Sequence, residues 1–378
     1  MDNEAVLIAA VSGRALAASA RRGGYLPLVA DFFGDQDTVA VAGAHVPLGG
    51  FAQGFRECEI MEALERLAAQ HAPNGLVYGT GFEDRPDVLS RLAQRWRLFG
   101  NSADTIAMVK DPEIFAAVCR NCDVAHPPIS LSPPPTHEGW LAKRRGGSGG
   151  FHIGAALGRA SGEGVYYQPR VPGTAVSALL LADGVSASVL GLSSQWARPT
   201  SHQPFRYGGA VRPADIASGV AERLSEAACR LAAALSLTGL NSADFMVHGD
   251  DFWILEINPR PGATLDIFEP EDGSLFALHM AACAGNLIDE TPRLDGAKAS
   301  AIFYAEHNLI APARFEWPDW SADRPNAGLA VKAGEPLCTV HATAATAMEA
   351  QALVNERSAL VHAWTHDWTH RCVHANTP

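Results

Sequence analysis

Through the first hundred residues, apolar runs are separated by stretches that contain polar residues and glycines. Continuous apolar runs at 5–10 and 25–30 flank a stretch of small residues, and each run ends at polar or glycine positions. Between 60 and 67, apolar residues recur at helical spacing, and a short apolar run follows at 76–78. Buried strands that alternate with amphipathic helices are typical of βαβ units. The pattern predicts a small parallel α/β domain over residues 1–105.

The middle of the chain predicts a helix, a linker and then mixed strands and helices. Asp111, followed by proline and glutamate, marks a helix start. The apolar face of that helix is predicted to hold Ile114, Phe115 and Val118. Five prolines within 127–135 indicate a linker, and residues 220–236 predict an amphipathic helix. Beyond residue 298, strand-like runs and turns return.

Residues 241–260 predict a β-hairpin that carries acidic side chains. A three-residue loop at 249–251 puts Asp244 directly opposite Glu256, and Asn258, two residues on, shares their face. Directly opposed Cβ atoms lie about 4.5–5.5 Å apart, and opposed like charges are destabilising unless a cation lies between them. Hard oxygen ligands without histidine or cysteine favour Mg²⁺. The other face is predicted to be apolar and to hold Phe245, Val247, Leu255 and Ile257. A solvated sheet face with chance acids is the alternative.

A strand at 140–144 leads into a glycine-rich loop at 146–150. Such a loop lets backbone N–H groups approach phosphate oxygens, and Lys143 adds a point charge. The segment is neither a Walker A motif nor a Rossmann fingerprint. Taken alone, it is equally well interpreted as a flexible turn.

The extended segment 166–173 can recognise a base through its backbone. Pro169 still offers its carbonyl to an exocyclic amine, and Val171 still offers its N–H to a ring nitrogen. An ordinary proline turn between two strands is the alternative interpretation.

The order of these segments resembles the ATP-grasp ligase superfamily over roughly residues 5–290. The resemblance implies an α/β (α+β) fold in four parts. They are a parallel pre-ATP-grasp domain at 1–105, a small central subdomain at 106–185, a C-terminal ATP-grasp lobe at 186–297 and a β-rich extension at 298–378.

The resemblance also implies roles for individual residues, with ATP and one or two Mg²⁺ ions (Mn²⁺ as a substitute) as cofactors. Lys110 and Lys143 hold ATP phosphates. The mobile flap over the triphosphate comprises Gly146, Gly147, Ser148, Gly149 and Gly150. The adenine hinge comprises Gln168, Pro169 and Val171. The metal ligands are Asp244, Glu256 and Asn258, and Arg260 contacts the transferring phosphoryl group.

Two departures from D-alanine–D-alanine ligases stand out. Ala175 replaces the usual ribose-binding acid, and Ser242 replaces an arginine. We expect Arg212 to take the place of that arginine, with Arg206 and Arg260 as alternatives.

The first 35 residues resemble the branch that includes tyramine–glutamate ligases of methanofuran synthesis. The shared segments are Val11-Ser-Gly-Arg14, Ala20-Arg-Arg-Gly-Gly-Tyr25 and Asp31-Phe-Phe-Gly-Asp35. Arg14 follows the first predicted strand, where ligands bind in open α/β sheets. We therefore expect Arg14 to bind an anionic substrate.

Composition narrows the class of protein. The 378 residues hold 41 acidic and 29 basic side chains, a formal charge of −12, which disfavours nucleic acid as a partner. No apolar run approaches the roughly 18–20 residues of a membrane span, and the start is acidic rather than basic. Seven scattered cysteines favour reduced thiols, so we expect a cytoplasmic protein.

The end of the chain is rich in histidine and tryptophan. Four histidines are spaced for one face of a helix: His362, His366, His370 and His374. A transition-metal site is one interpretation, and a docked or frayed terminal segment is the other. Residues 317–320 predict an aromatic packing corner.

The leading hypothesis is an ATP-dependent ligase that converts a carboxylate to an acylphosphate and couples it to an amine. Glutamate and a tyrosine- or tyramine-like amine are the expected small-molecule substrates, in cofactor biosynthesis. A bicarbonate-using carboxylase or carbamoyl-forming enzyme and a non-catalytic nucleotide-binding protein are the alternatives. A homodimer is the default expectation.

Overall fold

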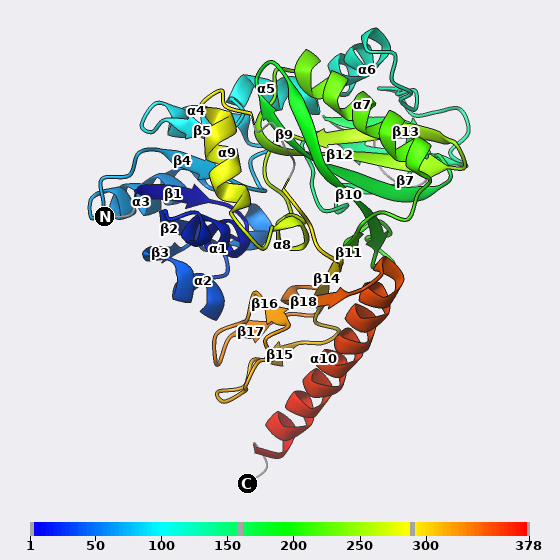
Figure 1. Cartoon of the computed structure of the whole chain (residues 1–378). Coiled ribbons are helices and arrows are strands. Elements are labelled where there is room, and N and C mark those ends of the chain that lie inside the picture. Colours follow the sequence, from blue (N-terminus) through cyan, green and yellow to red (C-terminus); the bar gives the residue numbers. More distant parts are fainter. Residues whose placement is uncertain (1–3, 157–161, 163, 288–291, 376–378) are drawn as a thin grey trace.

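The computed structural model describes residues 4–156, 162, 164–287 and 292–375, and it begins with a parallel sheet (Figure 1). Its five strands have the order β3-β2-β1-β4-β5, and every pair is parallel, as the apolar pattern predicted. The strands are β1 Ala5–Ala9, β2 Leu26–Asp31, β3 Ala44–Pro47, β4 Leu76–Tyr78 and β5 Leu98–Phe99. The helices of this region are α1 Arg14–Arg22, α2 Gln36–Val41, α3 Glu57–Ala68, α4 Pro86–Ala93 and α5 Ala103–Lys110, with a 3₁₀ turn at Phe51–Gln53.

Helix α6 (Pro112–Asn121) leads into a small three-stranded sheet with the order β7-β6-β8. The Asp111 carboxylate caps α6 by accepting hydrogen bonds from the next two free amides, which confirms the predicted start. The predicted apolar face was wrong in one position, because Ile114 is 44% exposed whereas Phe115 and Cys119 are buried. The strands are β6 Trp140–Arg144, β7 Ile153–Ala155 and β8 Val165–Pro169.

The larger lobe is built on an eight-stranded sheet with the order β13-β12-β9-β10-β11-β14-β18-β16. Its strands are β9 Thr174–Asp183, β10 Ala187–Ala197, β11 Tyr207–Arg212, β12 Thr238–His248, β13 Asp251–Asn258, β14 Ala297–Tyr304, β16 Ser321–Ala322 and β18 Pro336–Ala344. The helices are α7 Ser218–Ala234, α8 Leu265–Phe268 and α9 Leu275–Cys283. Helix α7 covers one face of the sheet through Leu224 and Leu231.

The opposite face of this sheet joins the lobe to the N-terminal domain. Helix α9 packs against α1 and against β9 and β12, so one apolar core runs from the parallel sheet into the large sheet. Phe276 on α9 is fully buried in that core, and its ring meets Tyr25 edge-on at 5.2 Å. This shared core fixes the position of the N-terminal domain relative to the lobe.

The C-terminal extension continues the large sheet and ends in a helix that is longer than the histidine spacing indicated. Strands β14, β18 and β16 carry the sheet on, and β15 (Leu309–Ile310) pairs with β17 (Ala330–Val331). Helix α10 (Ala347–Ala375) runs along these strands (Figure 1). Trp364 and Trp368 pack against the predicted aromatic corner, with the Trp320 ring stacked on Trp364.

The histidine spacing falls on α10, and the interpretation as a metal site stays untested there. His362 pairs with Glu306 at 3.4 Å, and the side chains of His370 and His374 lie outside the described residues. Within the described side chains no group of three acidic, histidine or cysteine residues is arranged to hold a metal ion. Among the described helices, none has the length and apolar character needed to cross a membrane.

The acid hairpin forms with a different loop from the predicted one. His248 pairs with Asp251, so the loop has two residues rather than three. A β-bulge between Asp244 and Phe245 then adds one residue to β13 and restores the predicted pairing of Asp244 with Glu256. Leu255 is the extra residue. It was predicted on the buried apolar face, but it instead lines a pocket beside Glu256.

The shared core gives a stability prediction. Phe276→Ala removes a fully buried ring between the two domains, so it should destabilise the protein by about 3–5 kcal/mol. Val185→Ala, at a position that is 81% exposed, is the matched control and should change stability by less than about 0.5 kcal/mol. Denaturant and thermal midpoints measure both. Equal midpoints for the two variants would contradict a core shared between the domains.

Candidate functional site

The hairpin brings the three predicted metal ligands together. Ser177 on β9 donates to Asp244 Oδ1 at 2.6 Å, and Asn258 Nδ2 donates to Asp244 Oδ2 at 2.9 Å. Lys110 Nζ lies 2.9 Å from Asn258 Oδ1 and 3.4 Å from Glu256 Oε2. The ammonium of Lys110 therefore occupies the position between these oxygens that a bound cation would take.

The pKa values of the two opposed carboxylates are shifted in opposite directions. Burial and the charge of Glu256 raise the pKa of Asp244 above its usual range. Burial acts in the same direction on Glu256, but the charges of Lys110, His152 and Lys143 prevail and hold the pKa of Glu256 below its usual range. The nearby positive charges thus favour the ionised form of Glu256, whereas the charge of Glu256 disfavours the ionised form of Asp244.

Lys143 approaches the same cluster from the small sheet. It lies on β6 between Ile153 of β7 and Tyr166 of β8, and its side chain is buried. Burial lowers the pKa of Lys143, and the charge of Glu256 opposes that shift. Lys110 therefore contacts the acid hairpin directly from α5, and Lys143 on β6 lies close enough for the charge of Glu256 to act on its pKa.

The glycine loop is held between two other segments. Gly146 has φ of +71°, and a Cβ there would lie 2.5 Å from the carbonyl oxygen of Glu83. A Cβ on Gly150 would overlap the carbonyl oxygen of Phe205. The Gly149 carbonyl accepts from the Tyr207 amide at 2.9 Å. Glycine is thus required at positions 146 and 150, because backbone atoms of the neighbouring segments lie too close for a Cβ atom.

A narrow pocket lies beneath this loop. It is lined by residues from three regions, among them Lys110, Gly146, Gly147, His152, Tyr166, Leu255 and Glu256. Phe115 and His126 line it too, with their rings edge-on at 5.4 Å. Burial lowers the pKa of His126 to about 4, so this ring is neutral at neutral pH. The lining of the pocket therefore includes both aromatic and charged side chains.

The predicted hinge lies beside the same strands. Pro169 ends β8 opposite Trp140 of β6, and Val171 follows in the connection to β9. The Gln168 side chain is buried, and its amide donates to the Pro127 carbonyl at 3.3 Å. The side chain of Gln168 is therefore used to hold the proline-rich linker.

Arg260 is fixed by a residue that sequence reasoning missed. Its Nε lies 2.7 Å from Glu83 Oε1, and both side chains are buried. The other oxygen of Glu83 accepts from the Gly81 amide at 2.7 Å. Burial alone would raise the pKa of Glu83, but the charges of Arg260 and Lys110 prevail and lower it. The only sequence signal was its place before Asp84-Arg-Pro, which indicated a helix start and no more.

The structure does not bring Arg212 or Arg206 to the hairpin. The Arg212 guanidinium is buried and donates to three backbone carbonyls, those of Ile267, Asp295 and Gly296. Arg206 donates to the Arg198 carbonyl and lies 3.8 Å from the centre of the Tyr304 ring. Both guanidinium groups are thus occupied by these contacts away from the acid hairpin.

Arg14 is surrounded by negative charge rather than open to an anion. Its guanidinium pairs with both oxygens of Asp266, with Asp323 at 2.8 Å and with Asp37 at 3.7 Å. These partners come from three separate parts of the chain. Because its charge is already more than balanced, the expectation that Arg14 binds an anionic substrate does not fit its surroundings.

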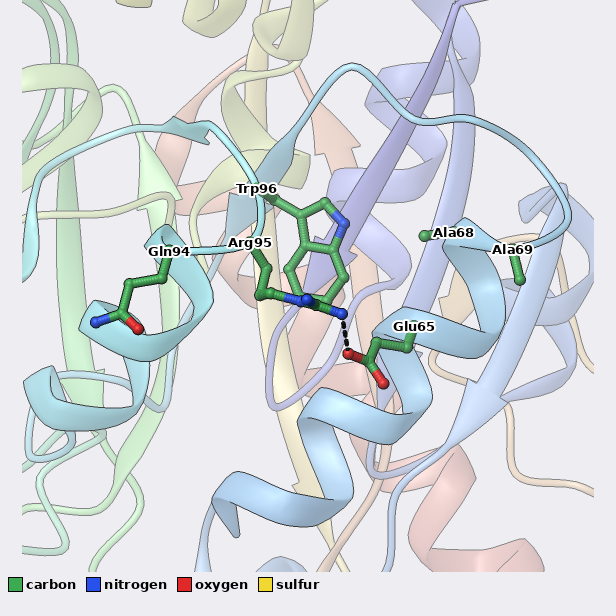
Figure 2. A pocket seen from close by; sticks show the side chains of 6 residues that line it. All are labelled: Glu65, Ala68, Ala69, Gln94, Arg95 and Trp96. Atoms are coloured by element: carbon green, nitrogen blue, oxygen red, sulfur yellow. Dashed lines mark hydrogen bonds and ion pairs between the residues drawn. The ribbon is translucent and has the colours of Figure 1, made fainter.

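A surface hollow on the N-terminal domain lies apart from this site (Figure 2). It is lined by Glu65, Ala68, Ala69, Gln94, Arg95 and Trp96. Arg95 pairs with Glu65 at 2.5 Å, and neither belongs to the predicted site. We assign no role to this hollow.

Comparison with known proteins identifies the central part of the chain. Residues 121–264 match the family model described as ATP-grasp domain. The formate-dependent phosphoribosylglycinamide formyltransferase of Paraburkholderia xenovorans (strain LB400) is 39% identical over 84 residues, which are 22% of this chain and 20% of that protein. The same enzyme of Burkholderia cenocepacia (strain HI2424) is 29% identical over 128 residues, 33% of this chain and 31% of that protein. The matches thus span a fifth to a third of these relatives.

Solved structures resemble nearly the whole chain. Biotin carboxylase of Campylobacter jejuni has a TM-score of 0.73 at 16% identity and covers 92% of this chain and 89% of its own. The biotin carboxylase domain of Hydrogenobacter thermophilus 2-oxoglutarate carboxylase has a TM-score of 0.71 at 13% identity, covering 92% and 87%. At these identities the likeness shows the fold alone. The chain therefore shares the fold of these biotin carboxylases, and its residues 121–264 match the ATP-grasp domain model.

Proposed function

We propose that this protein is an ATP-dependent ligase that activates a carboxylate as an acylphosphate and transfers the acyl group to an amine. The γ-phosphoryl group of ATP passes to the carboxylate oxygen and ADP leaves. The amine then attacks the acyl carbon, and phosphate leaves as the amide forms. The observation that carries this proposal is the convergence of Asp244, Glu256 and Asn258 with Lys110 and Lys143 beneath the glycine loop.

The residues present fit a magnesium ion. Asp244, Glu256 and Asn258 supply only oxygen ligands, and Lys110 already occupies the cation position between two of them. When bound, Mg²⁺ supplies neutralisation of the charge on the β- and γ-phosphate oxygens. With a metal ion between these oxygens, the ammonium of Lys110 would be available to contact a phosphate oxygen.

Lys143 and Arg260 act on the charge that develops on the transferring group. Both are buried, and fixed charges in a low-dielectric site stabilise a transition state more than charges in water do. Glu83 holds the Arg260 guanidinium in one orientation before substrate arrives. The glycine loop at 146–150 offers backbone amides to the phosphates. The backbone at 169–171, with Leu255 and Phe115, receives the adenine.

Glutamate, formate and bicarbonate are the candidate carboxylate substrates. The curated relatives are formate-dependent by name, whereas the structural neighbour from Hydrogenobacter thermophilus was solved with MgADP and bicarbonate. The likeness to the biotin carboxylases over 92% of this chain is the observation that favours bicarbonate as the second candidate. Glutamate with tyramine or tyrosine stays our first proposal.

A homodimer is also proposed, since the structural neighbour from Hydrogenobacter thermophilus is described as a dimer.

Substrate-dependent ADP release tests the reaction. Wild-type protein should release ADP with at least one of glutamate, formate or bicarbonate in the presence of tyramine. Glu256→Gln and Lys143→Ala should each lower the rate by about 10²–10³-fold, because each removes a charge that contacts metal or phosphate. Glu222→Gln, on the exposed face of α7, is the matched control and should leave the rate unchanged. Undiminished turnover in both site variants would exclude this mechanism.

The Glu83–Arg260 pair gives a separate prediction. Glu83→Gln weakens the buried contact that orients Arg260, so kcat should fall by up to about 100-fold while the KM for ATP changes little. Glu83→Asp keeps the charge and should recover part of the loss. Steady-state kinetics give both constants. A change confined to KM would show that Glu83 does not act through Arg260.

A further inference from the structure

Tyr207, at the start of β11, carries a hydroxyl group that the protein leaves without a hydrogen-bond partner. The phenolic oxygen is buried, and no group in the described ranges bonds to it. Ser300 on β14 lies close by, but the two hydroxyls do not reach hydrogen-bond geometry. Buried polar groups are nearly always bonded in folded proteins, so this exception points to a partner that a ligand supplies.

A β-bulge sets the face of the sheet on which the Tyr207 ring lies. The register of β10 and β11 shifts beside Tyr207, and Gly208 is the extra residue. Regular alternation would place Tyr207 on the face of Val211, which packs in the core of the C-terminal extension. The ring packs instead against the core shared with the N-terminal domain. That core also contains Leu179, which shares a face of β9 with Ser177, the donor to the acid hairpin. The bulge therefore puts the phenol on the face that carries the predicted metal ligands.

Both backbone groups of Tyr207 are engaged, so its position is fixed without the hydroxyl. Its amide donates to the Gly149 carbonyl of the glycine loop at 2.9 Å, and its carbonyl accepts from the Tyr304 hydroxyl at 2.9 Å. A Cβ on Gly208 would lie 2.9 Å from the Arg198 amide nitrogen, so the bulge is closely packed as well. The phenol is thus held beside the loop that we propose to cover the ATP phosphates.

The surroundings of the phenol keep it protonated. Burial raises the pKa of Tyr207, and the charges of Asp244 and Asp266 add to that shift, so the phenol lies near both carboxylates. Asp266 is paired with Arg14, and Asp244 is a ligand of the proposed magnesium ion. A protonated phenol is a hydrogen-bond donor, and its strongest partner is an oxygen that carries negative charge.

Two kinds of anionic oxygen take part in the proposed reaction, those of the phosphates and those of the carboxylate substrate. The phosphates are already provided with Lys110, Lys143 and the glycine loop. The arginines that were expected to bind substrate or phosphate, Arg14, Arg206 and Arg212, are held by other partners. The carboxylate is therefore the anion that still needs a donor.

We propose that the Tyr207 hydroxyl donates a hydrogen bond to an oxygen of the carboxylate substrate and holds that oxygen beside the acid hairpin. This proposal rests on the proposed function, because it takes the carboxylate from that reaction.

Calorimetric titration of carboxylates into the full chain tests this contact. The protein is first saturated with Mg²⁺ and AMP-PNP, an ATP analogue that does not transfer its phosphoryl group. The probes are glutamate, formate and bicarbonate, and we expect wild-type protein to bind at least one of them. Tyr207→Phe should bind that carboxylate at least about tenfold more weakly, because it loses a hydrogen bond to a charged group.

Two controls separate this role from a structural one. Tyr207→Phe keeps the ring and removes only a hydroxyl without a partner, so its thermal midpoint should not fall and its affinity for AMP-PNP should equal that of wild type. Tyr25→Phe is the matched variant, because the Tyr25 ring packs against Phe276 in the shared core. It should bind the carboxylate like wild type.

Three outcomes would overturn the proposal. They are no binding of any of the three carboxylates to wild-type protein at up to about 10 mM, equal carboxylate affinity in Tyr207→Phe and wild type, or a loss of AMP-PNP affinity in Tyr207→Phe with carboxylate affinity unchanged. The last result would assign the hydroxyl to the γ-phosphate.

Carboxylate-dependent ADP release by wild-type protein is measured separately. Release together with equal carboxylate affinity in Tyr207→Phe and wild type would overturn this proposal alone. Carboxylate binding that Tyr207→Phe weakens, without any release by wild type, would support the contact and overturn the proposed reaction alone.

Discussion

Two carboxylates are held directly opposite each other across a hairpin, and their repulsion constrains which charged groups can surround them. Asp244 and Glu256 cannot both be ionised at low cost unless positive charge lies between them. Lys110, at the end of α5, contacts Glu256 and Asn258, and the charge of Lys143 on β6 helps to lower the pKa of Glu256, so positive charge lies beside one of the two carboxylates. Electrostatic attraction to the hairpin thus acts on α5 and on the small sheet, in addition to the apolar core that joins the N-terminal domain to the large sheet.

The N-terminal domain takes part in the same arrangement. Glu83 reaches from the turn after β4 to Arg260, and the same turn presses on Gly146 of the glycine loop. On the other side of α8, Arg14 ties the N-terminal domain to Asp266 and Asp323. Buried pairs of this kind add little net stability but cost several kcal/mol when one partner is lost. They therefore serve to hold the site in one geometry, which phosphoryl transfer requires.

The sequence predicted the parts of the site that depend on local periodicity. Alternation along each strand was enough to predict that Asp244, Glu256 and Asn258 lie together. The loop was predicted one residue too long, but the β-bulge at Leu255 offsets that error, so Asp244 still pairs with Glu256. Glycine spacing indicated the loop over the pocket. The apolar pattern of the sequence does not reveal a register change of this type. A β-bulge changes the face of the sheet on which a residue lies without changing the apolar character of its side chain.

Contacts between distant segments could not be predicted. Glu83 pairs with Arg260, which lies 177 residues away along the chain, and no motif near Glu83 in the sequence indicates that partner. Arg212 was expected near the phosphates, but it instead donates to carbonyls of α8 and of the segment before β14. Arg14 pairs with acids from α8 and from the C-terminal extension. The length of α10 was also missed, because its apolar face depends on packing against Phe315 and Trp320 rather than on strong periodicity.

The central claim is that the acid hairpin holds a divalent cation together with nucleotide. Electron paramagnetic resonance of Mn²⁺, titrated into the protein with ADP, measures this binding directly. The account predicts that wild-type protein binds Mn²⁺ and that a Glu256→Gln, Asn258→Ala double variant binds it at least about tenfold more weakly. Equal Mn²⁺ affinity in the two proteins would contradict the assignment of the hairpin as the metal site.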